Sequence, residues 1–145
     1  MIPFLVERTV PLPSEEVWRR LTDWPAHGAQ VPLTRTRVLT PGPSGVGTRF
    51  AARTGIGRLS FDDPMEVVRW EPPVDGRPGV CRLEKTGRAV RGWALIEVRG
   101  TPGGGCRVRW TEALTVRRVP RSFDGLLARA GRVVFGRALD GLLRG

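Results

Sequence analysis

The sequence predicts an α+β domain in which an antiparallel sheet is followed by one long C-terminal helix. Residues 34–116 alternate between apolar and polar side chains and are divided by Gly- and Pro-rich turns, a pattern typical of strands joined by hairpins. After Pro120 the apolar spacing changes to about 3.6 residues, which indicates a helix. The length of 145 residues, 40% of them hydrophobic, suits a single domain over residues 1–145.

The N-terminal part is expected to form one strand and two short helices. Residues 2–10 are rich in β-forming side chains. Ser14 can cap a helix whose first turn holds two glutamates, which the positive end of the helix dipole favours. Trp24 and Pro25 interrupt this helix, and a second short helix is expected to reach about Gln30.

Six further strands are expected between residues 34 and 116. Their ranges are 34–39, 48–55, 57–63 continuing as 65–70, 80–87, 88–100 and 106–116. Pro64 predicts a bulge or kink inside the third of these strands, because proline cannot donate a ladder hydrogen bond. Asp62 and Asp63 precede that proline and are expected to accept hydrogen bonds from turn amides.

The terminal helix is expected over about residues 122–143. Its apolar side is formed by Phe123, Leu126, Leu127, Ala130, Val133, Val134 and Ala138. Four glycines interrupt the segment, and each weakens a helix by about 1 kcal/mol relative to alanine. The helix must therefore gain its stability by packing on the sheet.

The net charge of +10 at first suggests a nucleic acid or an anionic membrane as partner. However, 23 of the 24 basic residues are arginine, and they are spread along the chain together with 19 Gly, 13 Pro and no Tyr. This composition is typical of a GC-rich genome, so we do not expect nucleic acid as a specific partner. No apolar run reaches 18 residues, so membrane insertion is not expected. The first residues lack the pattern of a signal peptide, and we expect a bacterial protein of the cytoplasm.

The chain has only two cysteines and one histidine as nitrogen or sulfur ligands for a zinc ion. Cys81, Cys106 and His27 cannot form a four-ligand zinc site without carboxylates, so no metal and no cofactor are expected. Both cysteines are interpreted as small buried hydrophobes with free thiols. His27 is expected in an exposed helix or loop.

Several phrases resemble the START-like, or SRPBCC, superfamily, which includes polyketide cyclases and aromatases. They are VERTVPLPSEEVWRRLTDW at 6–24, GVGTRF at 45–50, DPMEVVRWEPP at 63–73, GGGCRVRWTEALTV at 103–116 and GRALDGLLR at 136–144. The resemblance implies a helix-grip fold, in which a curved antiparallel sheet wraps around the terminal helix and two short helices follow the first strand. It also implies an apolar cavity between the sheet and that helix, and a strand at 88–100 that separates the strands of the two cysteines.

Glu112 lies on the apolar face of its strand, beside Trp110. An ionised carboxylate in such a place costs several kcal/mol unless it is paired or hydrogen-bonded. Glu112 could contact cavity water, accept a hydrogen bond from a ligand, or pair with a basic side chain. Arg137, inside the apolar arc of the terminal helix, could enter the cavity as that partner or extend to water. Lys85 could point inward or reach solvent at its strand end.

The remaining candidates are apolar wall residues of the core or cavity. They are Phe50, Phe61, Leu83, Ile96, Val108, Ala130 and Val134. Together with Trp110, Glu112 and Arg137 they form the predicted ligand-binding set.

Three functions remain open. The first is binding of a small hydrophobic ligand of polyketide, lipid or isoprenoid type, as a carrier or sensor, by a monomer or homodimer. The second is a polyketide cyclase, aromatase or dehydratase in which Glu112 acts as acid or base and Arg137 holds a carbonyl. The third is a basic nucleic-acid-binding module. The absence of Tyr and of a Ser-His-acid or Cys-His set favours binding over catalysis.

Overall fold

The computed structural model describes residues 1–144 and shows the predicted α+β architecture. The strands are β1 (Phe4–Val10), β2 (Thr34–Val38), β3 (Arg49–Ile56), β4 (Leu59–Glu71), β5 (Gly79–Thr86), β6 (Val90–Gly100) and β7 (Cys106–Val116). The helices are α1 (Ser14–Leu21), α2 (Trp24–Ala29), the short 3₁₀ turn η1 (Arg121–Phe123) and α3 (Asp124–Arg144). Ser14 is the first residue of α1 and Pro13 occupies the N-cap position, so the expected cap at Ser14 is wrong.

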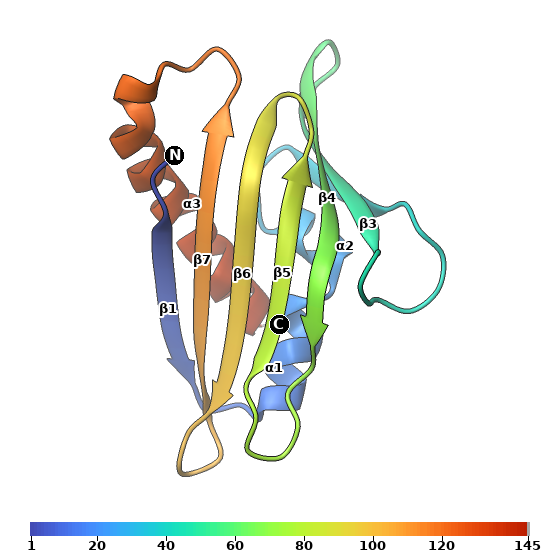
Figure 1. Cartoon of the computed structure of the whole chain (residues 1–145), viewed down its shortest axis with the longest axis vertical. Helices are drawn as coiled ribbons and strands as arrows, with labels where there is room; N and C mark the ends of the chain where they lie inside the picture. Colours follow the sequence, from blue (N-terminus) through green and yellow to red (C-terminus); the bar gives the residue numbers. More distant parts are fainter. Residues whose placement is uncertain (145) are drawn as a thin grey trace.

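The strands form one seven-stranded antiparallel sheet in the order β1-β7-β6-β5-β4-β3-β2. The neighbours β6, β5 and β4 occupy its middle, and the helices lie together on one face, with α3 crossing that face diagonally (Figure 1). Strand β6 separates the strands of Cys81 and Cys106, as expected, and both thiols are free and buried.

Strand β4 passes through Pro64 without interruption, so the bulge expected at this proline is wrong. The register of β4 against β3 continues through the pair Pro64 and Ala51, whereas pairing with β5 begins only at Met65. The proline nitrogen therefore removes no ladder bond on the β5 side. The register shift lies further along, between Val67 and Arg69.

Helix α3 packs on the sheet with a different face from the one expected. Its buried residues are Ala128, Gly131, Gly136, Ala138, Leu139, Leu142 and Leu143. A Cβ added at Gly131 would lie 2.5 Å from Cε1 of Phe4, so the absence of a side chain allows β1 and α3 to approach closely. This rotation leaves Leu126, Val133 and Val134 of the predicted apolar arc exposed.

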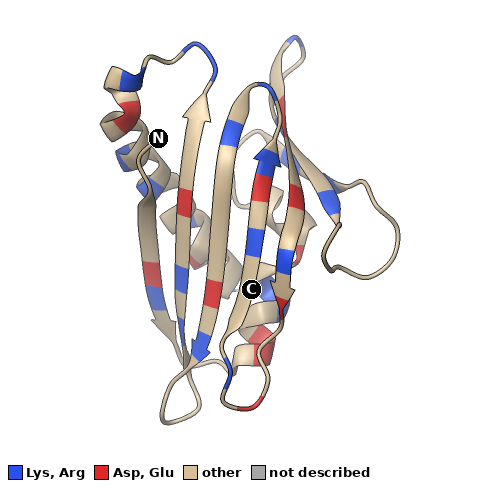
Figure 2. Ribbon diagram, viewed as in Figure 1, with Lys and Arg blue, Asp and Glu red and all other residues tan. Residues whose placement is uncertain are grey.

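Basic and acidic residues are mixed along the strands. Figure 2 shows Lys and Arg positions interspersed with Asp and Glu positions on β1, β4, β5, β6 and β7. On β5, Arg82 pairs with Glu84 at 2.9 Å, and on β7, Arg107 pairs with Glu7 of β1 at 2.6 Å. On this face the basic residues are not gathered into a single patch.

Candidate functional site

A cavity of about 130 Å³ lies between the helices and the sheet. Its walls come from α2, β2 to β7 and α3, so residues distant in sequence meet there. The apolar wall consists of Val31, Phe50, Ala52, Met65, Leu83, Ala94, Trp110, Val134, Phe135 and Ala138. Val134 is 42% exposed, so the cavity reaches the surface beside α3. Its volume is close to the roughly 150 Å³ of an engineered cavity that binds benzene.

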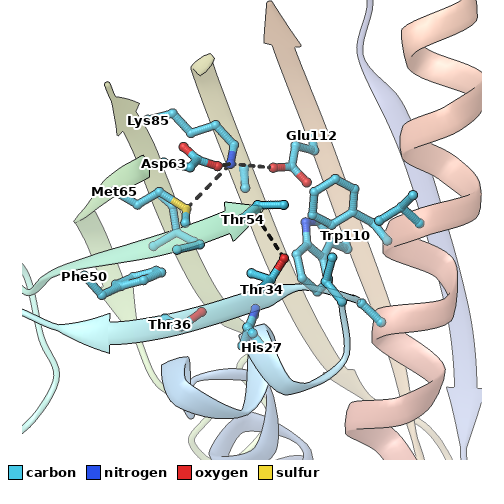
Figure 3. Close-up of a pocket in the computed structure, with 18 residues that line it drawn as sticks. His27, Thr34, Thr36, Phe50, Thr54, Asp63, Met65, Lys85, Trp110 and Glu112 are labelled. Atoms are coloured by element: carbon cyan, nitrogen blue, oxygen red, sulfur yellow. Dashed lines mark hydrogen bonds and ion pairs between the residues drawn. The ribbon is translucent and has the colours of Figure 1, made fainter. Parts of the chain in front are cut away.

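Three charged side chains from three strands meet in the cavity wall. The ammonium group of Lys85 on β5 lies 2.7 Å from Oδ2 of Asp63 on β4 and 3.2 Å from Oε1 of Glu112 on β7 (Figure 3). The side chains of Lys85 and Glu112 are only 3% and 1% exposed, and that of Asp63 is 15% exposed. We call Asp63, Lys85 and Glu112 the charged cluster. It contains two carboxylates and one ammonium group.

The electrostatics of the charged cluster follow from its burial. Burial raises the pKa of the Glu112 carboxyl more than the ammonium group of Lys85 and the indole of Trp110 lower it, and the nearby anion Asp63 adds to the rise. Burial alone would lower the pKa of Lys85, but the charges of Glu112 and Asp63 outweigh it, so this pKa is raised. Lys85 is therefore an ammonium ion at neutral pH.

Several polar atoms of the cavity wall lack partners. Oε2 of Glu112, Oδ1 of Asp63 and Nε1 of Trp110 are buried and make no hydrogen bond among the described residues. A native protein has few such atoms, and each calls for a specific explanation. Together they place two unused acceptors and one unused donor in residues that line the cavity.

His27 lies at the opposite side of the cavity from the charged cluster (Figure 3). Its Nε2 donates a 2.6 Å hydrogen bond to the carbonyl oxygen of Leu21, and its ring packs between Trp24 and Trp110. Burial lowers the pKa of His27, which favours the neutral ring. The expectation that His27 is an ordinary exposed residue is therefore wrong.

The structure places half of the predicted ligand-binding set around the cavity. Phe50, Leu83, Trp110, Glu112 and Val134 line it. Ile96 and Val108 do not, because they are fully buried in the core cluster that also contains α1 residues and Leu139.

The other three members of that set are exposed. Phe61 is 45% exposed near the tip of the β3–β4 hairpin, beyond the part of the sheet that the helices cover (Figure 1). Ala130 and Arg137 are exposed because α3 turns its glycine face toward β1. Arg137 therefore extends to solvent, and Lys85 is the partner of Glu112.

Sequence reasoning missed Asp63 as a cavity residue. The turn role expected for it is wrong, since it lies inside β4 and pairs with Lys85. A signal was present: Asp63, Met65 and Val67 share one parity along the strand, and Val67 is fully buried. The proline between them concealed this alternation.

The profile of the family described as "Polyketide cyclase / dehydrase and lipid transport" matches residues 1–144. The chain belongs to this family. As a member of this family it belongs to the START-like superfamily, as the phrases quoted above implied. Comparison with curated protein sequences gave no match.

Solved structures share the fold of this family member at low identity. The Zhui aromatase/cyclase from Streptomyces sp. R1128 is 15% identical with a TM-score of 0.68, over 98% of this chain and 92% of that one. A hypothetical protein from Helicobacter pylori is 17% identical with a TM-score of 0.71, over 99% and 86%. A protein from Thermus thermophilus is 18% identical with a TM-score of 0.67, over 99% and 92%. These similarities show the helix-grip fold.

Two negative findings hold for the part of the chain that the structure describes. Within residues 1–144 no group of three or more His, Cys, Asp or Glu side chains is arranged to hold a metal ion. Among the described helices, none has the length and apolar character needed to cross a membrane.

Proposed function

We propose that this protein binds a small hydrophobic ligand in the cavity beneath α3, as a carrier or sensor. The observation that carries the proposal is an apolar cavity that ends at a buried charged cluster. Ligand sites are mostly apolar with a few placed polar groups, and this cavity has that composition. Its 130 Å³ suits a single-ring ligand or one ring of a larger polyketide, lipid or isoprenoid ligand.

The family description, which names lipid transport beside cyclase and dehydrase, supports binding as well as catalysis. Three features of the cavity favour binding. The ring of His27 is held by a backbone carbonyl, Arg137 is exposed, and the ammonium group of Lys85 is already paired with two carboxylates. A group that activates a substrate carbonyl would need a donor that is free to reach it.

Native mass spectrometry of protein purified without detergent tests the proposal. A molecule that co-purifies should leave when the cavity is filled by Ala52→Phe, because Ala52 lines the cavity from β3. Ala51→Phe is the matched control, since Ala51 is the preceding residue of the same strand and does not line the cavity. Retention of the molecule by the Ala52→Phe variant, or an adduct-free wild-type protein that binds no apolar probe, would contradict the proposal.

A cyclase is the second candidate, because the raised pKa of Glu112 suits a general acid inside a cavity. In that case Glu112→Gln should abolish conversion of a polyketide substrate and leave its affinity within a fewfold. If the wild-type protein converts no substrate and the Glu112→Gln variant binds it more weakly, the result would instead favour the carrier. The measurement is substrate consumption by liquid chromatography beside a binding titration.

A further inference from the structure

The charged cluster has a hydrogen-bonding imbalance that bears on which ligands fit. An ammonium group has three N–H donors. The Nζ atom of Lys85 contacts Asp63 at 2.7 Å, Glu112 at 3.2 Å and the sulfur of Met65 at 3.6 Å. Its donors are therefore occupied by protein atoms (Figure 3). No donor of Lys85 is left for an anionic ligand.

The carboxylates have the opposite property. Each has one oxygen on Lys85 and one oxygen without a hydrogen-bond partner, Oδ1 of Asp63 and Oε2 of Glu112. Because these oxygens are buried, a ligand donor would reach them through a rotation of the carboxyl group toward the cavity. The indole N–H of Trp110 makes no hydrogen bond of ordinary geometry, although its interaction with the Glu112 carboxyl lowers the pKa of that group.

The charge of the cavity wall also disfavours an anionic ligand. With both carboxylates ionised, the charged cluster has two negative charges and one positive charge, and among the described lining residues Lys85 is the only Lys or Arg. A ligand carboxylate would meet a net negative charge at close range in a weakly screened site. A hydroxyl or an ammonium group would instead pair with an oxygen that now lacks a partner.

From this arrangement we infer that the cavity selects an apolar ligand whose inner end is a hydrogen-bond donor, a hydroxyl or an amine, and rejects ligands whose inner end is a carboxylate. This inference rests on the proposed binding function and adds the chemical class of the ligand. It excludes free fatty acids as inward-pointing ligands. The net charge of the whole chain, +10, would instead attract anionic ligands. Preference for a donor over a carboxylate therefore reports the cavity and not the net charge.

A matched series of four single-ring probes, the size that the 130 Å³ cavity suits, tests the inference, with binding measured by isothermal titration calorimetry at neutral pH. The probes are benzyl alcohol, benzylamine, benzoate and toluene. We expect the alcohol or the amine to bind at least tenfold more tightly than benzoate and more tightly than toluene. The alcohol and amine arms distinguish a neutral from a cationic donor.

The outcomes separate this inference from the function on which it rests. Binding of toluene as tight as that of both donors, or tighter binding of benzoate, would overturn the inference and leave a hydrophobic binding site. Absence of binding by all four probes would overturn both.

Variants of the charged cluster give an independent check. Glu112→Gln and Asp63→Asn each remove one negative charge, so each should reduce the discrimination against benzoate at least tenfold. Asp63→Asn preserves the contact between Lys85 and Glu112, and it serves if the Glu112→Gln variant fails to fold. Asp62→Asn is the control, because Asp62 is exposed, does not line the cavity and carries the same charge. Equal discrimination in the control and both cluster variants would overturn the inference.

Discussion

Replacing Lys85 by methionine should destabilise the protein strongly, because it removes the cation that two buried carboxylates share. Methionine keeps an unbranched apolar chain of similar length, so the change mainly removes charge. Glu112 would then be buried and unpaired beside Asp63, with no other Lys or Arg among the described residues that line the cavity. The two carboxylates would also repel each other.

The expected loss is about 3–5 kcal/mol, the range for a buried ion pair that loses one member. It is large beside a total stability of about 5–15 kcal/mol for a typical domain. Glu112→Gln should cost less, because Lys85 keeps its 2.7 Å contact with Asp63. Arg82→Met on the same strand is the control, because Arg82 pairs with Glu84 at 36% exposure and should lose no more than about 1 kcal/mol.

The pH dependence separates lost charge from altered packing. In the Lys85→Met variant the ammonium charge no longer offsets the burial that raises the pKa of Glu112. A carboxyl group whose pKa is raised by folding destabilises the folded state most above that pKa, where it is charged. The folded state regains stability as the pH falls and the carboxyl group is protonated. The deficit of the variant relative to wild type should therefore be larger at pH 8 than at pH 5.

Urea unfolding followed by tryptophan fluorescence measures the free energy of unfolding at both pH values. A loss below about 1 kcal/mol at pH 8, or an equal loss at pH 5 and pH 8, would refute the assignment of Lys85 as the compensating charge.

Three further predictions concern single positions. Gly131→Ala should lower stability by about 1–3 kcal/mol in thermal melts, because its Cβ would lie 2.5 Å from a ring carbon of Phe4. Gly125→Ala, which has open space around it, should raise stability by up to about 1 kcal/mol, and equal effects of the two would contradict this packing. The thiol of Cys81, whose pKa burial raises to about 12, should react with a disulfide reagent at pH 8 only after unfolding. His27, whose pKa burial lowers, should stay neutral in an NMR titration at pH 6.5, where an exposed imidazole is half protonated.

The fold was predictable because its main signals are local. Alternation along β7, the reversal at Gly57 and the change of period after Pro120 each report one element without knowledge of its neighbours. The face of α3 that packs on the sheet was not predictable in this way. A wheel assigns the apolar side to the largest hydrophobic residues, whereas the close contact with Phe4 requires the glycine at position 131.

Within the charged cluster the sequence placed Glu112 at the cavity, left Lys85 open between an inward position and solvent, and missed Asp63. Glu112 stands out because it interrupts an apolar face, whereas Lys85 and Asp63 sit near a strand end and beside a proline, where solvent exposure is the usual outcome. Their pairing depends on the register between β4 and β5, in which Met65 faces Lys85. Such a register joins residues about twenty positions apart and is not encoded in either segment alone.

The charged cluster is better explained by ligand recognition than by stability. Replacement of a buried ion pair by apolar side chains is often neutral or stabilising, and each unpaired buried polar atom costs about 1–3 kcal/mol. A fold that needed only a firm core would gain from apolar residues at Asp63, Lys85 and Glu112. The two unpaired carboxylate oxygens are a cost in the protein alone, and on the proposed binding function a ligand donor would satisfy them. Functional sites commonly reduce the stability of the fold that contains them, and the destabilising charged cluster lies in the wall of the cavity.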